Sequence, residues 1–257
     1  MADIPVVLIH GYPFDHTMWF STIAALGSKA RAIAPDLPGF GRNPVLRNKS
    51  PNLDYYADFI SGELARTGYE KAVVAGMSMG GYVALAFAEK YPAKLCGFGL
   101  ISSQTAEDSA EAKISRSEMI QKIRSNGVSA VSEATAPKMF SEKALENLRH
   151  YVIEGVEKAG ADGLCWALEA MAKRPDRTAV LKGMQAPVLI VHGAQDKIVP
   201  VSKARGLADE CNQAIFVEVP GAGHATPLEA PDAVAAGLVR LLEVCHRQEG
   251  MRATNAS

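Results

Sequence analysis

Cysteine is scarce in this chain, which has four among its 257 residues. The four lie far apart in apolar surroundings, and no two form the Cys-x-x-Cys spacing typical of a zinc or redox site. The sequence therefore predicts buried thiols in a reducing compartment rather than metal ligands. They are Cys96, Cys165, Cys211 and Cys245.

An excess of charge of one sign is also lacking. The 27 basic and 28 acidic residues are interspersed and give a formal net charge of −1. Binding to the phosphates of a nucleic acid requires a basic stripe or patch, so no nucleic-acid partner is expected.

Long hydrophobic runs are missing as well, although the apolar share of 48% is ordinary for a folded domain. No apolar run approaches the roughly 18 residues that suggest a membrane span, and no basic-then-apolar signal peptide precedes Ile4. We therefore expect a cytoplasmic protein without a membrane partner. The sequence leaves its oligomeric state open.

Three motifs of cofactor-dependent enzymes are absent from the sequence. These are the His-Glu-x-x-His motif of zinc proteases, the Gly-x-Gly-x-x-Gly motif of dinucleotide-binding folds, and the P-loop. The sequence therefore disfavours a metal enzyme or a dinucleotide-dependent enzyme, and neither a metal nor a cofactor is expected.

Short β-branched runs alternate with helical patterns over the first hundred residues, which is typical of a parallel sheet covered by helices. The length suits a single α/β domain. The expected strands span residues 5–9, 30–34, 72–75, 95–101, 188–191 and 215–219. The expected helices span 16–26, 53–67, 82–90 and 232–246, with one more between the last two strands.

Strand signals disappear between residues 104 and 177, where helix-forming residues dominate. Helices are expected over 106–125, 141–158 and 161–173. We interpret residues 104–177 as a helical cap inserted into an α/β core of residues 1–103 and 178–257. A cap inserted after the fourth strand must lie over the carboxyl edge of the sheet, so part of it should cover a pocket there.

The segment Gly76-Met77-Ser78-Met79-Gly80 lies between a predicted strand and a predicted helix. A turn tight enough to expose a serine hydroxyl strains the serine backbone, and side chains two residues to either side would collide, so glycine is required there. The following helix directs its N-terminal N–H groups at the position where an oxyanion would form. Ser78 is therefore the candidate nucleophile, and the alternative is a Gly/Ser turn without chemistry.

His224 is the candidate general base. It follows the last predicted strand, at the sheet edge where ligand-binding loops gather. His150 lies in the cap and His246 near the C-terminal end, so neither is well placed. His10 and His192 each precede a glycine at a strand end and are interpreted as structural histidines. The same interpretation is the alternative for His224.

Asp196 is the candidate acid that orients this histidine, because it too leaves the carboxyl end of a strand. A helix cap or a solvated loop carboxylate is the alternative. Glu107 and Asp108 follow the fourth strand and are alternative third members, although they look like the first turn of a cap helix. Two further carboxylates are given structural roles: Asp36 in a turn and Glu229 at the start of the last helix.

Together these segments resemble the α/β-hydrolase superfamily, in which the chain order serine, acid, histidine is diagnostic. The likeness spans essentially the whole chain outside the cap. Small bacterial esterases, enol-lactonase-like hydrolases and cofactor-free haloperoxidases are the most similar members. The segments are His10-Gly11-Tyr12-Pro13, Asp36-Leu37-Pro38-Gly39-Phe40-Gly41, Gly76 to Gly80, His192-Gly193 with Asp196, and Gly223-His224.

The resemblance implies an α/β-hydrolase fold whose oxyanion hole is formed by the backbone N–H groups of Tyr12 and Met79. Family members usually carry two strands before the His-Gly strand, whereas this chain begins almost at it. We therefore expect a trimmed, mostly parallel sheet of about six strands, flanked by helices. Serine at position 78 argues against dehalogenase or epoxide hydrolase chemistry, for which the family carries aspartate there.

The expected function is hydrolysis of small carboxylic esters or lactones through an acyl-enzyme on Ser78. Perhydrolase, haloperoxidase-like or C–C bond hydrolase activity from the same triad is an alternative. A slow-turnover, receptor-like binding protein is another. The natural substrate, and the relative specificity for its acyl and alcohol parts, stay open.

The substrate pocket is expected to be apolar and modest in size, suited to acyl chains of about two to six carbons. Apolar residues on the cap helices more often pack against the core than line a pocket. The candidate pocket residues are Phe14, Phe40, Phe140 and Trp166, and the cap also carries Met119, Met139 and Met171.

Overall fold

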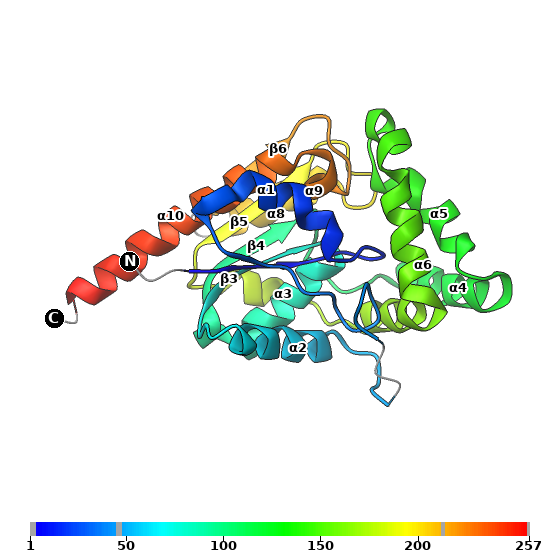
Figure 1. The fold of residues 1–257 in the computed structure, drawn as a ribbon, viewed down its shortest axis with the longest axis horizontal. Coiled ribbons are helices and arrows are strands. Elements are labelled where there is room, and N and C mark those ends of the chain that lie inside the picture. Colours follow the sequence, from blue (N-terminus) through cyan, green and yellow to red (C-terminus); the bar gives the residue numbers. More distant parts are fainter. Residues whose placement is uncertain (1–3, 45–47, 212–213, 256–257) are drawn as a thin grey trace.

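The computed structural model describes residues 4–44, 48–211 and 214–255. The strands are β1 (Val6–Ile9), β2 (Ala32–Ile33), β3 (Ala72–Met77), β4 (Leu95–Ile101), β5 (Val188–Gly193) and β6 (Ile215–Val219). They form one sheet in the order β2-β1-β3-β4-β5-β6, and every neighbouring pair is parallel (Figure 1). The expected parallel sheet of about six strands is confirmed.

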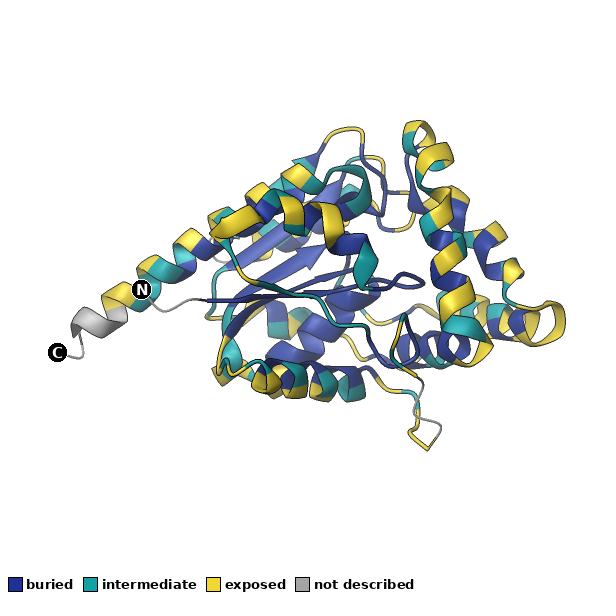
Figure 2. Ribbon diagram, in the orientation of Figure 1, coloured by how far each residue is buried: buried dark blue, intermediate teal, exposed yellow. Residues whose placement is uncertain are grey.

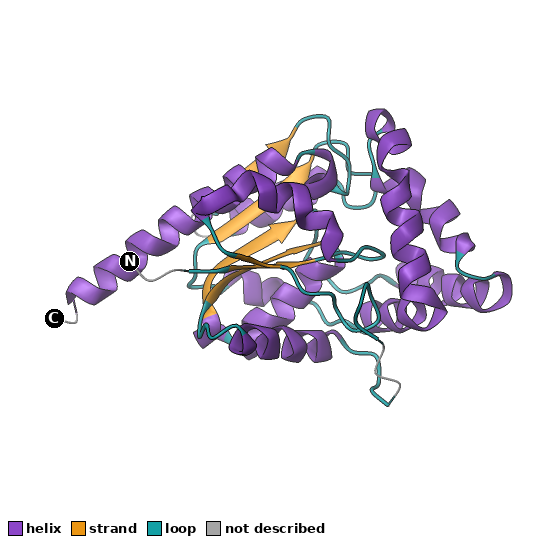
Figure 3. Cartoon of the chain, viewed as in Figure 1, coloured by secondary structure: helices purple, strands orange, loops and turns teal. Residues whose placement is uncertain are grey.

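Helices cover both faces of this sheet (Figure 3). Around the sheet lie η1 (His16–Trp19), α1 (Phe20–Leu26), η2 (Gly27–Lys29), α2 (Leu53–Arg66), α3 (Met79–Lys90), η3 (Pro92–Lys94), α7 (Thr178–Lys182), α8 (Val201–Glu210), α9 (Thr226–Glu229) and α10 (Pro231–Asn255). Helices α1 and α10 pack together on one face, and α2 and α3 pack together on the other. Because both faces are covered, the central strands are apolar along their whole length.

Burial is deepest in the middle of the sheet and in α3 (Figure 2). All six residues of β3 are buried, and α3 is buried from Met79 to Ala88 because it lies between the sheet and α2. The turn that joins β3 to α3 is therefore held between two rigid elements. A side chain on that turn has a fixed position at the carboxyl edge of the sheet.

A second group of helices lies beyond the carboxyl edge of the sheet (Figure 1). It consists of α4 (Ala110–Asn126), α5 (Ser129–Met139) and α6 (Glu142–Ala172), which pack against one another. Within α6, Gly160 has φ 61° and ψ −179°, so the helix is broken there. This break agrees with the two helices expected over 141–158 and 161–173.

Several expectations about the elements differ from the structure, among them α4, which begins at Ala110 rather than at residue 106, and α10, which ends at Asn255 rather than at residue 246. Helix α5 was not predicted, because Pro137 and the Ser and Thr residues of this segment weaken the helical pattern. Strand β3 continues beyond the expected 72–75, since Gly76 and Met77 still pair with β4. Helix α3 begins at Met79 rather than at residue 82, directly after the turn.

None of the four cysteines, all of which lie in the described ranges, forms a disulfide. Three of them are buried, and Cys96 is half-buried. Burial raises the pKa of the Cys245 thiol to about 12. In the part of the chain that the structure describes, no helix combines the length and the apolar character that crossing a membrane requires.

Candidate active site

Ser78 occupies the turn between β3 and α3 in a strained backbone conformation, with φ 51° and ψ −114°. A Cβ added to Gly76 would lie 2.0 Å from the carbonyl oxygen of Gly80. A Cβ added to Gly80 would lie 2.2 Å from the carbonyl oxygen of Ile9. The predicted need for glycine at both positions is confirmed, and the tight turn lifts Ser78 out of the sheet edge.

The structure brings together the three side chains that the sequence singles out. His224 lies between β6 and α9, and its Nε2 is 2.8 Å from the Oγ of Ser78. The Nδ1 of the same ring is 2.7 Å from the Oδ2 of Asp196, which follows β5. Since His224 is 1% exposed, this chain of hydrogen bonds is shielded from water except at the serine. The arrangement can move a proton from Ser78 to His224.

Asp196 is held from both of its oxygens. Oδ1 accepts the backbone N–H groups of Ile198, at 2.8 Å, and Val199, at 2.9 Å. Oδ2 faces His224 and also lies 3.0 Å from Nε2 of His192. Burial would raise the pKa of the Asp196 carboxyl, but hydrogen bonds from His192, His224 and the Val199 N–H, with the charge of His224, hold it well below its usual range. Asp196 is therefore a stable carboxylate that can support a positive imidazole.

The two other strand-end histidines have structural partners. The Nε2 of His10 accepts the Leu37 N–H at 2.9 Å, while its Nδ1 lies 3.0 Å from the carbonyl oxygen of Gly11. Burial lowers the pKa of His10. The Nε2 of His192 donates to the carbonyl oxygen of Val199 at 2.8 Å. Both histidines join loops at the carboxyl edge, in agreement with their interpretation from the sequence.

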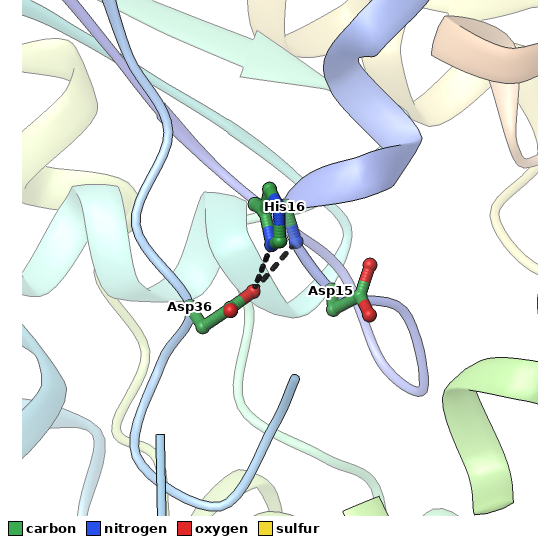
Figure 4. Close-up of side chains that lie close together, drawn as sticks. All are labelled: Asp15, His16 and Asp36. Atoms are coloured by element: carbon green, nitrogen blue, oxygen red, sulfur yellow. Dashed lines mark hydrogen bonds and ion pairs between the residues drawn. The ribbon is translucent and has the colours of Figure 1, made fainter. Parts of the chain in front are cut away.

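Asp36 forms a compact group with Asp15 and His16 (Figure 4). Its Oδ1 accepts the backbone N–H of His16 at 2.8 Å and lies 2.7 Å from the ring Nδ1 of the same residue. Asp15 is paired with Lys158 at 3.2 Å. Because these carboxylates already have partners within the chain, the group serves to fix the two loops, and Asp36 stabilises its turn as expected.

The remaining candidate carboxylates lie in other environments. Asp108 is bound by two arginines, Arg116 of α4 and Arg174, which contact both of its oxygens. Glu107 is exposed and pairs with Lys113. The structure therefore places neither of them beside the imidazole.

Glu229 differs from its predicted role at the start of the last helix. It is the final residue of α9, and its Oε1 accepts the N–H of Gly223 at 2.9 Å. Its Oε2 accepts the N–H of Ser141, at 3.0 Å, and the hydroxyl of the same serine, at 2.6 Å. One carboxylate thus joins the loop that carries His224 to the start of α6. The predicted role at the start of the last helix was wrong, because α10 begins two residues further along the chain, at Pro231.

The two N–H groups expected to bind an oxyanion flank Ser78. Met79 is the first residue of α3, so its N–H has no partner within the helix. Gly11 passes so close that a Cβ added to it would lie 3.4 Å from the Cβ of Ser78. Tyr12, the next residue, lines the same cavity as Ser78. The β1 turn and the first turn of α3 therefore meet beside the serine hydroxyl.

A cavity of about 400 Å³ opens beside Ser78 and His224. This volume lies in the range of small-molecule sites. Helices α4, α5 and α6 supply most of its wall. The lining residues are Tyr12, Ser78, Tyr82, Ala112, Ser115, Arg116, Met119, Ala134, Thr135, Lys138, Met139, Leu168, Met171, Ile198 and His224.

The four residues expected to line the pocket do not line this cavity. Phe14, Phe40 and Phe140 are each 1% exposed and belong to the core. The ring of Trp166 packs against Tyr56 of α2, with centroids 4.7 Å apart. The expectation is corrected: the three phenylalanines are buried packing residues of the core, and the half-buried Trp166 packs against α2 outside this cavity.

Several lining residues were not identified from the sequence. Tyr82 lies four positions after Ser78, one turn along α3, so its side chain points toward the same end of the sheet. Ile198 follows Asp196 on one loop. Their spacing from Ser78 and Asp196 could have identified Tyr82 and Ile198 from the sequence. Arg116 lies on α4, and no local sequence pattern determines how that helix is oriented.

Comparison with known proteins places this geometry in a family. Residues 6–237 match the Alpha/beta hydrolase family. A thermophilic esterase from Thermogutta terrifontis, solved with malate bound, superposes with a TM-score of 0.89 at 34% identity, covering 95% of this chain and 90% of that chain.

Two curated relatives are also similar in sequence. The 3-oxoadipate enol-lactonase 1 of Acinetobacter baylyi is 27% identical over 232 residues, which are 88% of this chain and 84% of that protein. The dihydrolipoyllysine-residue acetyltransferase component of the acetoin cleaving system of Pseudomonas putida is 30% identical over 90% of this chain. This chain spans 61% of the length of the latter. The match over most of the chain, together with the parallel sheet, shows that the protein belongs to the alpha/beta hydrolase family.

Proposed function

We propose that this protein is a serine hydrolase that cleaves small carboxylic esters or lactones through an acyl-enzyme on Ser78. The observation that carries the proposal is the continuous chain of hydrogen bonds from Ser78 through His224 to Asp196, at 2.8 and 2.7 Å. Its esterase and enol-lactonase relatives support ester hydrolysis in general.

The first half of the reaction transfers the acyl group to the protein. Ser78 Oγ attacks the carbonyl carbon while His224 Nε2 takes its proton, and Asp196 stabilises the imidazolium. The oxyanion accepts hydrogen bonds from the N–H groups of Tyr12 and Met79, each of which lowers the barrier by about 3–4 kcal/mol. His224 then returns the proton to the departing alkoxide.

The second half releases the acid. Water enters the cavity, His224 takes a proton from it, and the hydroxide attacks the acyl carbonyl. Collapse of the second tetrahedral intermediate returns the proton to Ser78 Oγ. No residue in this sequence of steps requires a metal or an organic cofactor.

The wider setting is part of the same proposal. Residues 1–103 and 178–257 form the catalytic core, and residues 104–177 form a cap that shapes the pocket. A cytoplasmic location is supported by the four cysteines, none of which forms a disulfide.

Labelling with a fluorophosphonate tests the proposal. We expect one phosphonyl group per chain, attached to Ser78 by mass spectrometry, and continuous turnover of p-nitrophenyl acetate that EDTA does not reduce. A single burst of p-nitrophenol without turnover would instead indicate a receptor-like protein. Loss of activity in EDTA that zinc restores would contradict the mechanism.

Chain length should determine the rate on neutral esters. The wall formed by α4, α5 and α6 limits the cavity to about 400 Å³. We expect kcat/KM for p-nitrophenyl esters to rise up to about six acyl carbons, since each buried methylene contributes about 0.8 kcal/mol, and then to fall sharply. A rise that continues through twelve carbons would contradict a closed pocket.

Two variants test which residues limit the length of the acyl chain. Met171→Ala enlarges the cavity and should move the fall to longer chains, because Met171 lines it. Trp166→Ala is the matched control, since its ring packs against α2 outside the cavity, and it should leave the position of the fall unchanged.

A further inference from the structure

The wall of the cavity beside Ser78 carries positively charged side chains and no negatively charged ones among the described residues. Two of its lining residues, Arg116 and Lys138, carry a positive charge, and no aspartate or glutamate occurs among the described residues that line it. Lys138 is exposed at the end of α5 and forms no ion pair within the described ranges. Arg116 is better enclosed, with its side chain 21% exposed. A substrate that enters here meets a positive potential.

Arg116 keeps one of its amino groups available. Its Nε and Nη2 both donate to the carboxylate of Asp108, so the guanidinium is fixed in the plane of that pair. The third nitrogen, Nη1, lies 3.5 Å from the thioether sulfur of Met171, which is a weak acceptor. Since Met171 also lines the cavity, a stronger acceptor in the cavity would improve on this contact.

The charge on this arginine is only partly compensated. Asp108 is shared with a second guanidinium, because Nη1 of Arg174 donates to it at 2.6 Å. Arg174 is almost fully buried and lies over the ring of Tyr82, 4.0 Å from its centroid. Two guanidinium groups thus share one carboxylate, which leaves one positive charge in excess within this cluster. Because Arg174 lies over the ring of Tyr82, which lines the cavity, this excess charge is close to the cavity wall.

A neutral donor lies in the same wall. The hydroxyl of Tyr12 is buried and has no hydrogen-bond partner in the described structure, although the residue lines the cavity. Burial raises the pKa of Tyr12, so its hydroxyl stays protonated and can act as a neutral donor. A buried hydroxyl without a partner is destabilising, so an acceptor from a ligand would be stabilised here.

We infer that the substrate carries a carboxylate away from the reacting carbonyl, bound by Nη1 of Arg116 and the hydroxyl of Tyr12. The substrate class is then a monoester, or a lactone, of a dicarboxylic acid. One excess positive charge together with one neutral donor matches a monoanion better than a dianionic phosphate. Lys138 adds attraction at the mouth of the cavity. This inference rests on the proposed hydrolysis at Ser78.

The test compares esters that differ only in the terminal group. Monomethyl esters of the C4 to C8 dicarboxylic acids are assayed against methyl esters of monocarboxylic acids of equal chain length, at pH 7.5 and low salt. At the best length we expect kcat/KM to be about tenfold or more higher for the anionic ester. This preference should shrink in 0.5 M NaCl, because salt screens the partly exposed cation.

Two variants assign the preference to its residues. Arg116→Gln should lower the ratio of anionic to neutral kcat/KM by about tenfold, mainly through KM, and Tyr12→Phe should lower it several-fold. Lys113→Gln is the matched control, since Lys113 lies on the same helix and pairs with Glu107 outside the cavity. Tyr12→Phe keeps the ring and the backbone N–H, so it remains informative if Arg116→Gln does not fold.

A binding measurement separates this inference from the proposed function. Calorimetry should show that Ser78→Ala binds the monomethyl ester of a dicarboxylic acid. The methyl ester of the monocarboxylic acid of equal chain length should bind about tenfold more weakly. That result supports the carboxylate site even if no ester is turned over. Equal binding and equal kcat/KM of the two ester series, or an unchanged ratio in Arg116→Gln, would overturn the inference.

Discussion

Replacing Ser78 by alanine should reduce kcat/KM for p-nitrophenyl butyrate by about four to six orders of magnitude. The variant lacks the hydroxyl oxygen that His224 Nε2 contacts at 2.8 Å, so no acyl-enzyme can form. The residual rate comes from the oxyanion donors acting on bound water. The measurement is initial-rate kinetics over a range of enzyme concentrations.

The folded state should change little in the same variant. Ser78 lies at the end of a rigid strand, and alanine keeps the Cβ while adding no bulk. We expect Tm to move by less than about 4 °C, which corresponds to about 1 kcal/mol in a protein of this size. Ser125→Ala, an exposed serine on α4, is the control and should retain full activity. Near-normal hydrolysis by Ser78→Ala would show that the nucleophile lies elsewhere.

Asp196→Asn should reduce kcat by about four orders of magnitude, and the structure gives the reason. The N–H groups of Ile198 and Val199 both donate to Oδ1, so an amide at this position must keep its oxygen there. Its NH2 group then occupies the place of Oδ2 and faces the ring of His224. Nδ1 is forced to accept a hydrogen bond, and the ring proton moves to Nε2. Such a ring cannot take the proton of Ser78.

Glu107→Gln provides the matched control for this loss. Glu107 is an exposed carboxylate that pairs with Lys113, and its amide should leave kcat within a factor of two. Asp108→Asn is less suitable, because it weakens the contacts of two arginines and changes stability as well. Full activity of Asp196→Asn, with loss in Glu107→Gln, would assign the third residue to the cap.

The convergence of the three candidate side chains could be predicted from the sequence because their positions depend on strand ends. In a parallel sheet all carboxyl ends meet at one edge, so Ser78, Asp196 and His224, which are distant in sequence, converge there. The glycines around Ser78 added a steric reason that is independent of any partner. The boundaries of β3 and α3 were less accurate, since the turn itself contributes residues to both elements.

The pocket could not be predicted in the same way. Side chains on a helix turn by about 100° per residue, so Trp166 and Leu168 of α6 point in nearly opposite directions. Leu168 faces the cavity, and Trp166 packs on α2. Which of the two faces inward depends on how α6 is rotated against the core, and this is set by contacts between segments far apart in the sequence.

The carboxylate of Glu229 has a consequence for engineering. Helices α4, α5 and α6 supply most of the cavity wall, so an exchange of residues 110–172 between relatives is a route to altered pockets. This segment meets the rest of the chain where Glu229 binds Ser141 on one side and the His224 loop on the other. A transplanted segment that lacks a hydroxyl at position 141 would remove one of the two hydrogen bonds that Oε2 of Glu229 accepts, next to the loop of His224. Chimeras should therefore keep Ser141 and Glu229 together, and mutant libraries should leave both residues unchanged.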